Sequence, residues 1–136
     1  MFEHEIQLRV RYSETDQMGY VYYGNYAAYF EVARVEALRS LGITYKELEE
    51  EGIMLPVLDF TIKYSKPAFY DDLLTIKVKI PVIPTARIIF EYETINQSGE
   101  IINKAVTTLV FINKHSGKPC AAPQDVLARM NKYFAH

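Results

Sequence analysis

One carboxylate and a group of tyrosines lie close together in the first third of the chain. Asp16 is followed, within ten positions, by glycines and tyrosines: Gly19, Tyr20, Tyr22, Tyr23, Gly24 and Tyr26. A carboxylate can act as a nucleophile or as a general base for water. Backbone N–H groups at a helix start can stabilise an oxyanion, and glycine lets a substrate approach the backbone closely. A helical pattern begins near Tyr23, so the segment combines all three features, and acyl transfer is the chemistry that uses them.

The same residues also have a structural interpretation. Aspartate is favoured in loops and near helix starts, where a negative charge is stabilised, so Asp16 can be a loop or capping residue. The tyrosines can pack in a core or in a subunit interface. Alternatively, they can form an aromatic wall for an acyl chain or ring. Residue types and spacing alone leave both interpretations open.

Length and composition limit the class of protein. The 136 residues, 49% of them hydrophobic and 24% charged, suit one globular domain over residues 1–136. The net charge of −2 offers no basic excess for nucleic acid or for an anionic membrane surface. Residues 1–10 lack the apolar core of a signal peptide, and no apolar run reaches membrane-spanning length. We therefore expect neither a nucleic-acid partner nor membrane insertion.

Cysteine and histidine usage favours neither a disulfide nor a metal site. Cys120 is the only cysteine, which fits a reducing compartment, and we expect a cytoplasmic protein. His4, His115 and His136 are scattered along the chain and lack the spacing of a zinc or iron site. We expect no metal and no other cofactor.

Hydrophobic periodicity predicts an α+β fold. Apolar and polar residues alternate in five strand-like segments, and helical patterns occupy three others. The expected strands are residues 5–12, 58–64, 74–82, 87–95 and 100–113, and the expected helices are residues 23–41, 44–51 and 123–134. One long helix then has to be buried by an antiparallel sheet of about five strands, which must curve around it. The long helix is therefore expected to fill the concave side of the sheet.

Two apolar surfaces support this arrangement. The long helix places small and large apolar residues on one face: Tyr26, Phe30, Ala33, Ala37 and Leu41. In the strand at residues 100–113 both faces are apolar, because Leu109 and Phe111 lie opposite a face that is already apolar. Such a strand belongs in the middle of a sheet, or a partner subunit covers its outer face.

Two blocks of the sequence resemble a known family. The signature of hotdog-fold acyl-CoA thioesterases is similar to residues 12–26 and 30–42, which read YSETDQMGYVYYGNY and FEVARVEALRSLG. A second block agrees with it at residues 62–76, IKYSKPAFYDDLLTI. More narrowly, both blocks resemble the 4-hydroxybenzoyl-CoA thioesterase-like branch, and the similarity extends from about residue 6 to residue 113.

The resemblance implies a single hotdog domain that hydrolyses an acyl-CoA thioester to the free acid and coenzyme A. Asp16 takes the position of the family's catalytic carboxylate, as nucleophile or general base. The backbone N–H of Tyr23 takes the position of the donor that polarises the carbonyl, where many members carry histidine and the hydroxybenzoyl-CoA enzymes carry tyrosine. The expected substrate-binding residues are Gly19, Val21, Tyr22, Gly24, Asn25, Tyr26 and Arg87, the last meeting the coenzyme A phosphates.

The resemblance also implies an oligomer. Family members form homodimers in which two sheets join edge to edge and the active sites lie at the interface. Two such dimers often pair into a homotetramer. We expect an interface of this kind to explain why Leu109 and Phe111 need covering.

Two other functions are open. A hotdog domain could hold an acyl-CoA or acyl-carrier-protein thioester without cleaving it, and the absence of histidine at position 23 favours that binding module. A hotdog dehydratase or hydratase is less favoured, because no Asp/His pair is placed for proton transfer. The acyl group is not determined, since the tyrosine-rich loop suits an aromatic acyl group and an aliphatic chain equally well.

Overall fold

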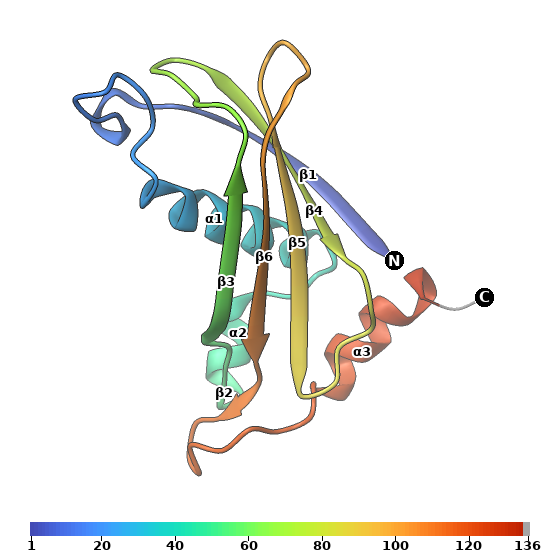
Figure 1. The fold of residues 1–136 in the computed structure, drawn as a ribbon. Coiled ribbons are helices and arrows are strands. Elements are labelled where there is room, and N and C mark those ends of the chain that lie inside the picture. The colour runs from blue at the N-terminus through green and yellow to red at the C-terminus, as the bar shows by residue number, and fades with distance from the viewer. Residues whose placement is uncertain (135–136) are drawn as a thin grey trace.

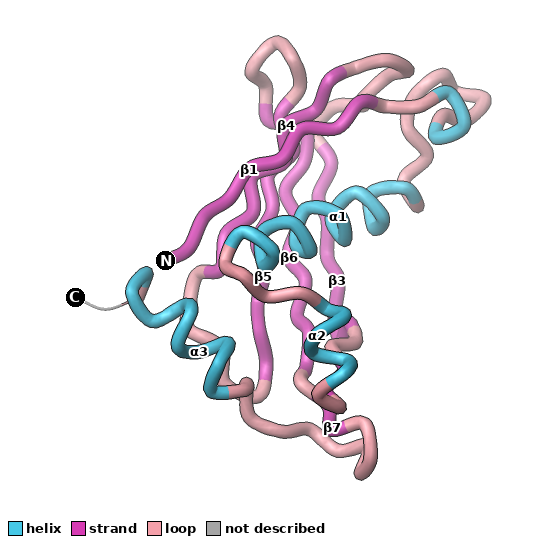
Figure 2. Tube along the Cα trace, turned by 180° about the vertical axis from the view of Figure 1, so that it is seen from behind, coloured by secondary structure: helices cyan, strands magenta, loops and turns pink. Residues whose placement is uncertain are grey.

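A five-stranded antiparallel sheet and one long helix make up most of the computed structural model, which describes residues 1–134 (Figure 1). The strands are β1 (Phe2–Arg9), β3 (Val57–Tyr64), β4 (Leu73–Ile80), β5 (Arg87–Ile95) and β6 (Ile101–Val110). Their order across the sheet is β1-β4-β5-β6-β3, and every neighbouring pair is antiparallel. The long helix α1 (Asn25–Ser40) lies across one face of this sheet (Figure 2).

The remaining elements are short. They are the helices α2 (Tyr45–Glu50) and α3 (Gln124–Met130), the two-stranded ribbon of β2 (Ile53–Met54) with β7 (Ile112–Asn113), and 3-10 turns at Tyr12–Glu14 and Asn131–Tyr133. No helix within residues 1–134 combines the length and the apolar character that crossing a bilayer requires. His136, one of the three histidines, lies outside the described residues.

The packing of α1 against the sheet forms the core. The Phe30 ring lies between Tyr92 of β5 and Phe60 of β3, with ring centroids 4.5 Å and 6.0 Å away. Ala33 and Ala37 are fully buried, so the helix backbone approaches the strands closely, as expected from their small side chains. The predicted apolar face of the helix is confirmed.

The predicted order of elements is confirmed, with shifted boundaries. The first strand begins at Phe2 and ends at Arg9, because the chain turns into a 3-10 turn at Tyr12. The long helix begins at Asn25, two residues later than expected. The Thr44 side chain accepts a hydrogen bond from the Glu47 N–H at 3.2 Å, which confirms the predicted cap of α2. The ribbon of β2 and β7 was not predicted, because two-residue strands carry no periodicity.

The expectation that a partner subunit covers Leu109 and Phe111 is wrong. Both side chains are buried within this chain, where they face the same core as α1. The partly exposed residues of β6 include Val106 and Val110, on the opposite face of the strand. Alternation identified two apolar faces, but it did not determine which of them faces the helix.

Beneath the first turns of α1, the sheet contains buried polar side chains. Thr94 of β5 pairs with Asn103 of β6, and Asn103 pairs with Tyr64 of β3. The Thr94 hydroxyl and both amide atoms of Asn103 have no hydrogen-bond partner within residues 1–134. By contrast, the buried Thr107 hydroxyl lies 2.6 Å from the Tyr92 hydroxyl. Two threonines on the same sheet therefore differ in whether their buried hydroxyl is satisfied.

This contrast predicts opposite effects of the same substitution. Thr94→Val should leave the free energy of unfolding unchanged or raise it by up to about 1 kcal/mol, because it removes an unsatisfied hydroxyl. Thr107→Val, the matched control, should lower it by about 1–2 kcal/mol, because the Tyr92 hydroxyl loses its partner. Urea unfolding of the two variants measures both values, and an equal loss in both would contradict the assignment.

Candidate active site

A pocket of about 810 Å³ opens at the N-terminal end of α1. Three segments enclose it: the loop that precedes the helix, the first turn of the helix, and the segment that follows β3. Its lining residues are Asp16, Gln17, Met18, Tyr20, Val21, Tyr22, Tyr23, Tyr26, Tyr64, Ser65, Lys66 and Pro67. Both sequence blocks that carry the family resemblance contribute to this one pocket.

Asp16 lies on a tight loop that is closed by its own hydrogen bonds. The Asp16 N–H donates to the Tyr20 carbonyl at 3.0 Å, and the Gly19 N–H donates to the Asp16 carbonyl at 3.0 Å. Gly19 has a φ of +86°, which explains the need for glycine at this position. The Asp16 Oδ1 accepts the Met18 N–H at 2.9 Å, whereas Oδ2 accepts no hydrogen bond from residues 1–134. One carboxylate oxygen is therefore free to take part in chemistry at the pocket.

The start of α1 supplies backbone hydrogen-bond donors, and the adjacent Tyr23 lines the same pocket as Asp16. The Asn25 and Tyr26 N–H groups donate to the carbonyls of Tyr22 and Tyr23 at 2.9 Å and 3.2 Å. The N–H groups of Tyr23 and Gly24 donate to no acceptor in the described part of the chain. They belong to the N-terminal end of a 16-residue helix, where the helix dipole favours negative charge. These donors can stabilise a developing oxyanion.

The end of β3 and the segment that follows it form another wall of the pocket, through Tyr64, Ser65, Lys66 and Pro67. The Val21 N–H donates to the Ala68 carbonyl at 2.8 Å, and Tyr20 forms a bridge with Phe69, so the Asp16 loop is hydrogen-bonded to this wall. Tyr26 of α1 packs edge-on against Tyr64 at 5.7 Å between ring centroids. Burial, together with the neighbouring Tyr64, raises the pKa of Tyr26 to about 12. Tyr26 is therefore a neutral wall residue at physiological pH.

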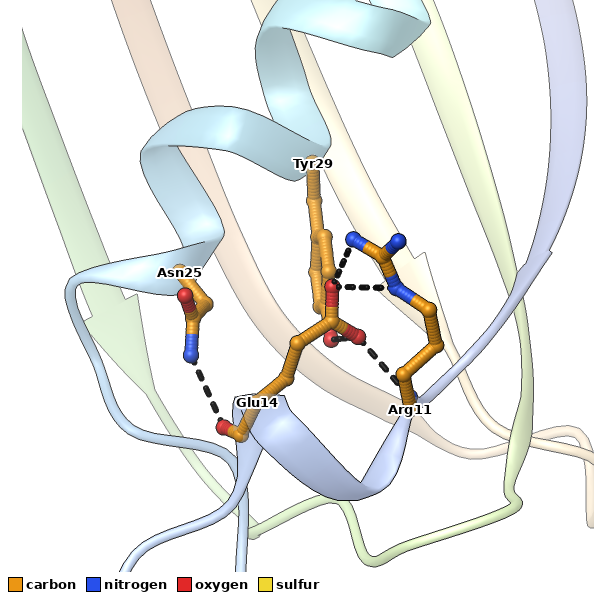
Figure 3. Close-up of polar contacts among 4 residues, drawn as sticks. All are labelled: Arg11, Glu14, Asn25 and Tyr29. Atoms are coloured by element: carbon orange, nitrogen blue, oxygen red, sulfur yellow. Dashed lines mark hydrogen bonds and ion pairs between the residues drawn. The ribbon is translucent and has the colours of Figure 1, made fainter.

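Glu14 connects the loop to the helix (Figure 3). Its carboxylate accepts hydrogen bonds from the Arg11 N–H at 2.8 Å, from the Arg11 guanidinium at 3.1 and 2.8 Å, and from the Tyr29 hydroxyl at 2.8 Å. Its carbonyl accepts the Asn25 side-chain amide at 2.8 Å. Burial opposes the charge on Glu14, but these donors outweigh it and lower the pKa of the carboxyl. Sequence periodicity gave no signal for this contact.

The structure brings five of the nine predicted site residues into the pocket lining: Asp16, Val21, Tyr22, Tyr23 and Tyr26. Gly24 is absent from the lining. A side-chain carbon added there would lie 2.8 Å from the Tyr22 ring, so Gly24 makes room for that ring. Asn25 directs its amide to the Glu14 carbonyl, and Gly19 has open space around it in the turn.

Arg87 is not among the residues that line this pocket, and its contact with the coenzyme A phosphates stays a prediction. It begins β5, opposite Val110, while the pocket lies at the other end of the sheet, where Asn103 pairs with Tyr64. Lys66, which was not predicted, is the only cationic lining residue within residues 1–134, and its ammonium group pairs with Glu100. Strand register, not spacing along the chain, determines which end of the sheet each of these residues reaches.

Within residues 1–134, no three His, Cys, Asp or Glu side chains gather closely enough to hold a metal ion. Five of the twelve residues that line the pocket are tyrosines, and Asp16 contributes the carboxylate. Tyr20, one of the tyrosines considered as an aromatic wall, also lines the pocket; besides Lys66, the lining residues missed from the sequence are Gln17, Met18, Tyr64, Ser65 and Pro67. All of them lie within the two blocks quoted for the resemblance, which was the available signal.

The lowered pKa of Glu14 predicts a pH-dependent stability difference. Glu14→Gln should lower the free energy of unfolding by about 2 kcal/mol at neutral pH, because hydrogen bonds to a charged group are weakened. A folded-state pKa below the ordinary 4.5 means that this contribution is complete above pH 4.5 and declines as the pH falls through the folded-state value. Urea unfolding of wild type and variant from pH 7 to about pH 3 should show the difference shrinking. A difference in unfolding free energy that stays constant over this pH range would contradict the assigned role of the Glu14 charge.

Comparison with known proteins agrees with this geometry. The model of the thioesterase-like superfamily matches residues 10–130. A putative acyl-CoA thioesterase of Bacillus subtilis, YneP, is 35% identical over 113 residues, which cover 83% of this chain and 82% of that protein. The acyl-CoA thioesterase YbgC of Haemophilus influenzae is 34% identical and covers 89% of both chains.

A solved structure gives the same result. The DHNA-CoA thioesterase of Staphylococcus aureus superimposes with a TM-score of 0.93 at 33% identity, covering 98% of this chain and 92% of that one. The antiparallel sheet wrapped against α1 is thus the hotdog fold. On the extent of these matches, the chain belongs to the thioesterase-like superfamily of hotdog-fold proteins.

Proposed function

We propose that this protein is a thioester hydrolase that cleaves an acyl-CoA to the free acid and coenzyme A. One observation carries the proposal: Asp16, whose Oδ2 accepts no hydrogen bond from residues 1–134, and Tyr23, whose N–H has no acceptor there, line the same pocket. The names of the relatives, acyl-CoA thioesterases among them, support the substrate class.

In the proposed mechanism, the N–H groups of Tyr23 and Gly24 bind the thioester oxygen and stabilise the negative charge that it gains. Asp16 attacks the carbonyl carbon to form an anhydride that water then hydrolyses, or it removes a proton from a water that attacks directly. Either way the C–S bond breaks, the sulfur leaves as a thiolate that takes a proton, and the acyl group leaves as the acid. The Tyr23 hydroxyl has no part in these steps.

The acyl group is proposed to lie against the aromatic wall. Tyr22, Tyr26 and Tyr64 line the pocket, and Tyr26 is almost completely buried. Gly19 leaves open space at the tip of the Asp16 loop. Lys66, at the rim, is the cationic lining residue that could meet a phosphate of coenzyme A. A cytoplasmic location, expected from the single cysteine, stays a prediction.

Replacing the carboxylate tests the proposal. Asp16→Asn should lower kcat about 10²- to 10⁴-fold, because the amide can neither attack nor remove a proton at neutral pH. The control, Tyr23→Phe, keeps the backbone N–H and should retain kcat within about threefold. Thiol release from benzoyl-, short-chain and long-chain acyl-CoA measures both, with circular dichroism confirming the fold.

The alternative function has its own outcome in the same assay. Tight binding of an acyl-CoA by wild type without release of thiol would show a binding module in place of an enzyme. Full activity of Asp16→Asn on every thioester that wild type cleaves would show that Asp16 is not the reacting group.

We also propose that two copies join through β3. Within residues 1–134 this strand pairs with β6 alone, so its outer edge has backbone groups without a partner there, and its apolar side chains Val57, Leu58, Phe60 and Tyr64 are exposed. Exposed apolar edge strands are templates for pairing with another chain. Because Tyr64 also lines the pocket, this pairing would place the site beside the interface. The homotetramer is a further step of the same prediction.

A charge on this edge should separate the copies. Leu58→Lys should convert a dimer into a monomer, because an edge lysine blocks strand pairing. The control, Val82→Lys, places the same charge at another exposed apolar position, outside the sheet, and should leave the dimer intact. Light scattering after size-exclusion chromatography gives the masses. A monomeric wild type, or a dimeric Leu58→Lys, would refute the interface.

A further inference from the structure

Glu14 is a nearly buried carboxylate two residues before Asp16 and outside the pocket. Its side chain is 12% exposed and accepts four hydrogen bonds, three from Arg11 and one from the Tyr29 hydroxyl. The proposed reaction does not use it. A carboxylate with this many donors is held in one orientation, because movement would leave several charged or buried groups without partners.

The backbone of Glu14 is fixed as firmly as its side chain. Its carbonyl accepts the Tyr22 N–H at 2.9 Å and the Asn25 side-chain amide at 2.8 Å. Thr15 forms an antiparallel β-bridge with Val21, so the loop that carries Asp16 closes at the residue that follows Glu14. Glu14 therefore lies at the base of this loop, where the two ends of the loop come together next to the start of α1.

We propose that Glu14 is a positioning residue that, through Tyr29, holds the Asp16 carboxylate in register with the free N–H groups at the start of α1. The proposal rests on the function proposed above. In that reaction both groups must reach the same carbonyl. The carboxylate acts at the carbonyl carbon, and the N–H donors bind the carbonyl oxygen. These groups come from a loop and a helix, and Glu14 joins the two.

Tyr29 is the partner that connects Glu14 to the helix. Arg11 is mostly exposed and directly precedes the 3-10 turn that contains Glu14, so their ion pair orients the carboxylate locally and is weakened by solvent. Tyr29 is buried on α1, one turn after Asn25, and its hydroxyl bridges the two elements. Burial and the Glu14 carboxylate both raise the pKa of Tyr29, so its hydroxyl keeps the proton that it donates.

The test is Tyr29→Phe, with Tyr45→Phe as its matched control. The Tyr45 hydroxyl also bonds a charged group of α1, accepting from Arg34 Nε at 3.2 Å, but it lies toward the other end of the helix, away from the pocket. Each variant loses one hydroxyl bonded to an ion. Tyr29→Phe should lower kcat about 10- to 100-fold with little change in KM, while Tyr45→Phe should keep wild-type kcat despite a similar loss of thermal stability. Glu14→Gln should behave like Tyr29→Phe.

A second measurement does not depend on activity. Hydrogen exchange of the Asp16, Gly19 and Tyr22 amides, which are bonded within the loop, should accelerate about tenfold in Tyr29→Phe and stay unchanged in Tyr45→Phe. Equal losses of kcat in both variants, or wild-type exchange in Tyr29→Phe, would overturn the positioning role. If wild type releases no thiol from any acyl-CoA, the proposed function fails, and the exchange rates alone then decide whether Glu14 holds the loop.

Discussion

The structure depends on the burial of one helix against one face of an antiparallel sheet. Phe30 packs between aromatic rings of β3 and β5, and the buried alanines of α1 let the helix backbone lie close to the strands. This contact buries apolar side chains of both the helix and the sheet, and such burial is the main stabilising term in folding. It also fixes where the N-terminal end of α1 points, and everything in the candidate site is placed relative to that end.

The site uses this fixed end in two ways. The helix start brings to the pocket the Tyr23 N–H, which has no acceptor within residues 1–134, and its first turns provide Asn25 and Tyr29 as partners for Glu14. Residues 15–20 of the loop that carries Asp16 are partly or fully exposed, and hydrogen bonds to the Ala68 segment and to the start of the helix hold the loop. A reacting group on a loop thereby gains the rigidity of the core, which is what preorganised catalysis requires.

Much of this could be predicted from the sequence, because it depends on local periodicity. Alternation located the five strands, the spacing of apolar residues located α1, and Asp16 before a helix start indicated acyl-transfer chemistry. What could not be predicted depends on register between distant segments. Alternation did not show which face of β6 packs against α1, and spacing did not show that Arg87 and the pocket lie at opposite ends of the sheet. Pairing of Glu14 with Tyr29, 15 residues apart and across a loop, has no periodic signal.

In the proposed mechanism, a thioester binds with its carbonyl between Asp16 and the start of α1. A crystal structure of Asp16→Asn with a bound acyl-CoA tests this directly. We predict the carbonyl oxygen at about 3 Å from the N–H of Tyr23 or Gly24, with the carbonyl carbon facing the residue at position 16. A thioester bound in the pocket with its carbonyl turned away from both groups, or bound elsewhere on the molecule, would contradict the claim.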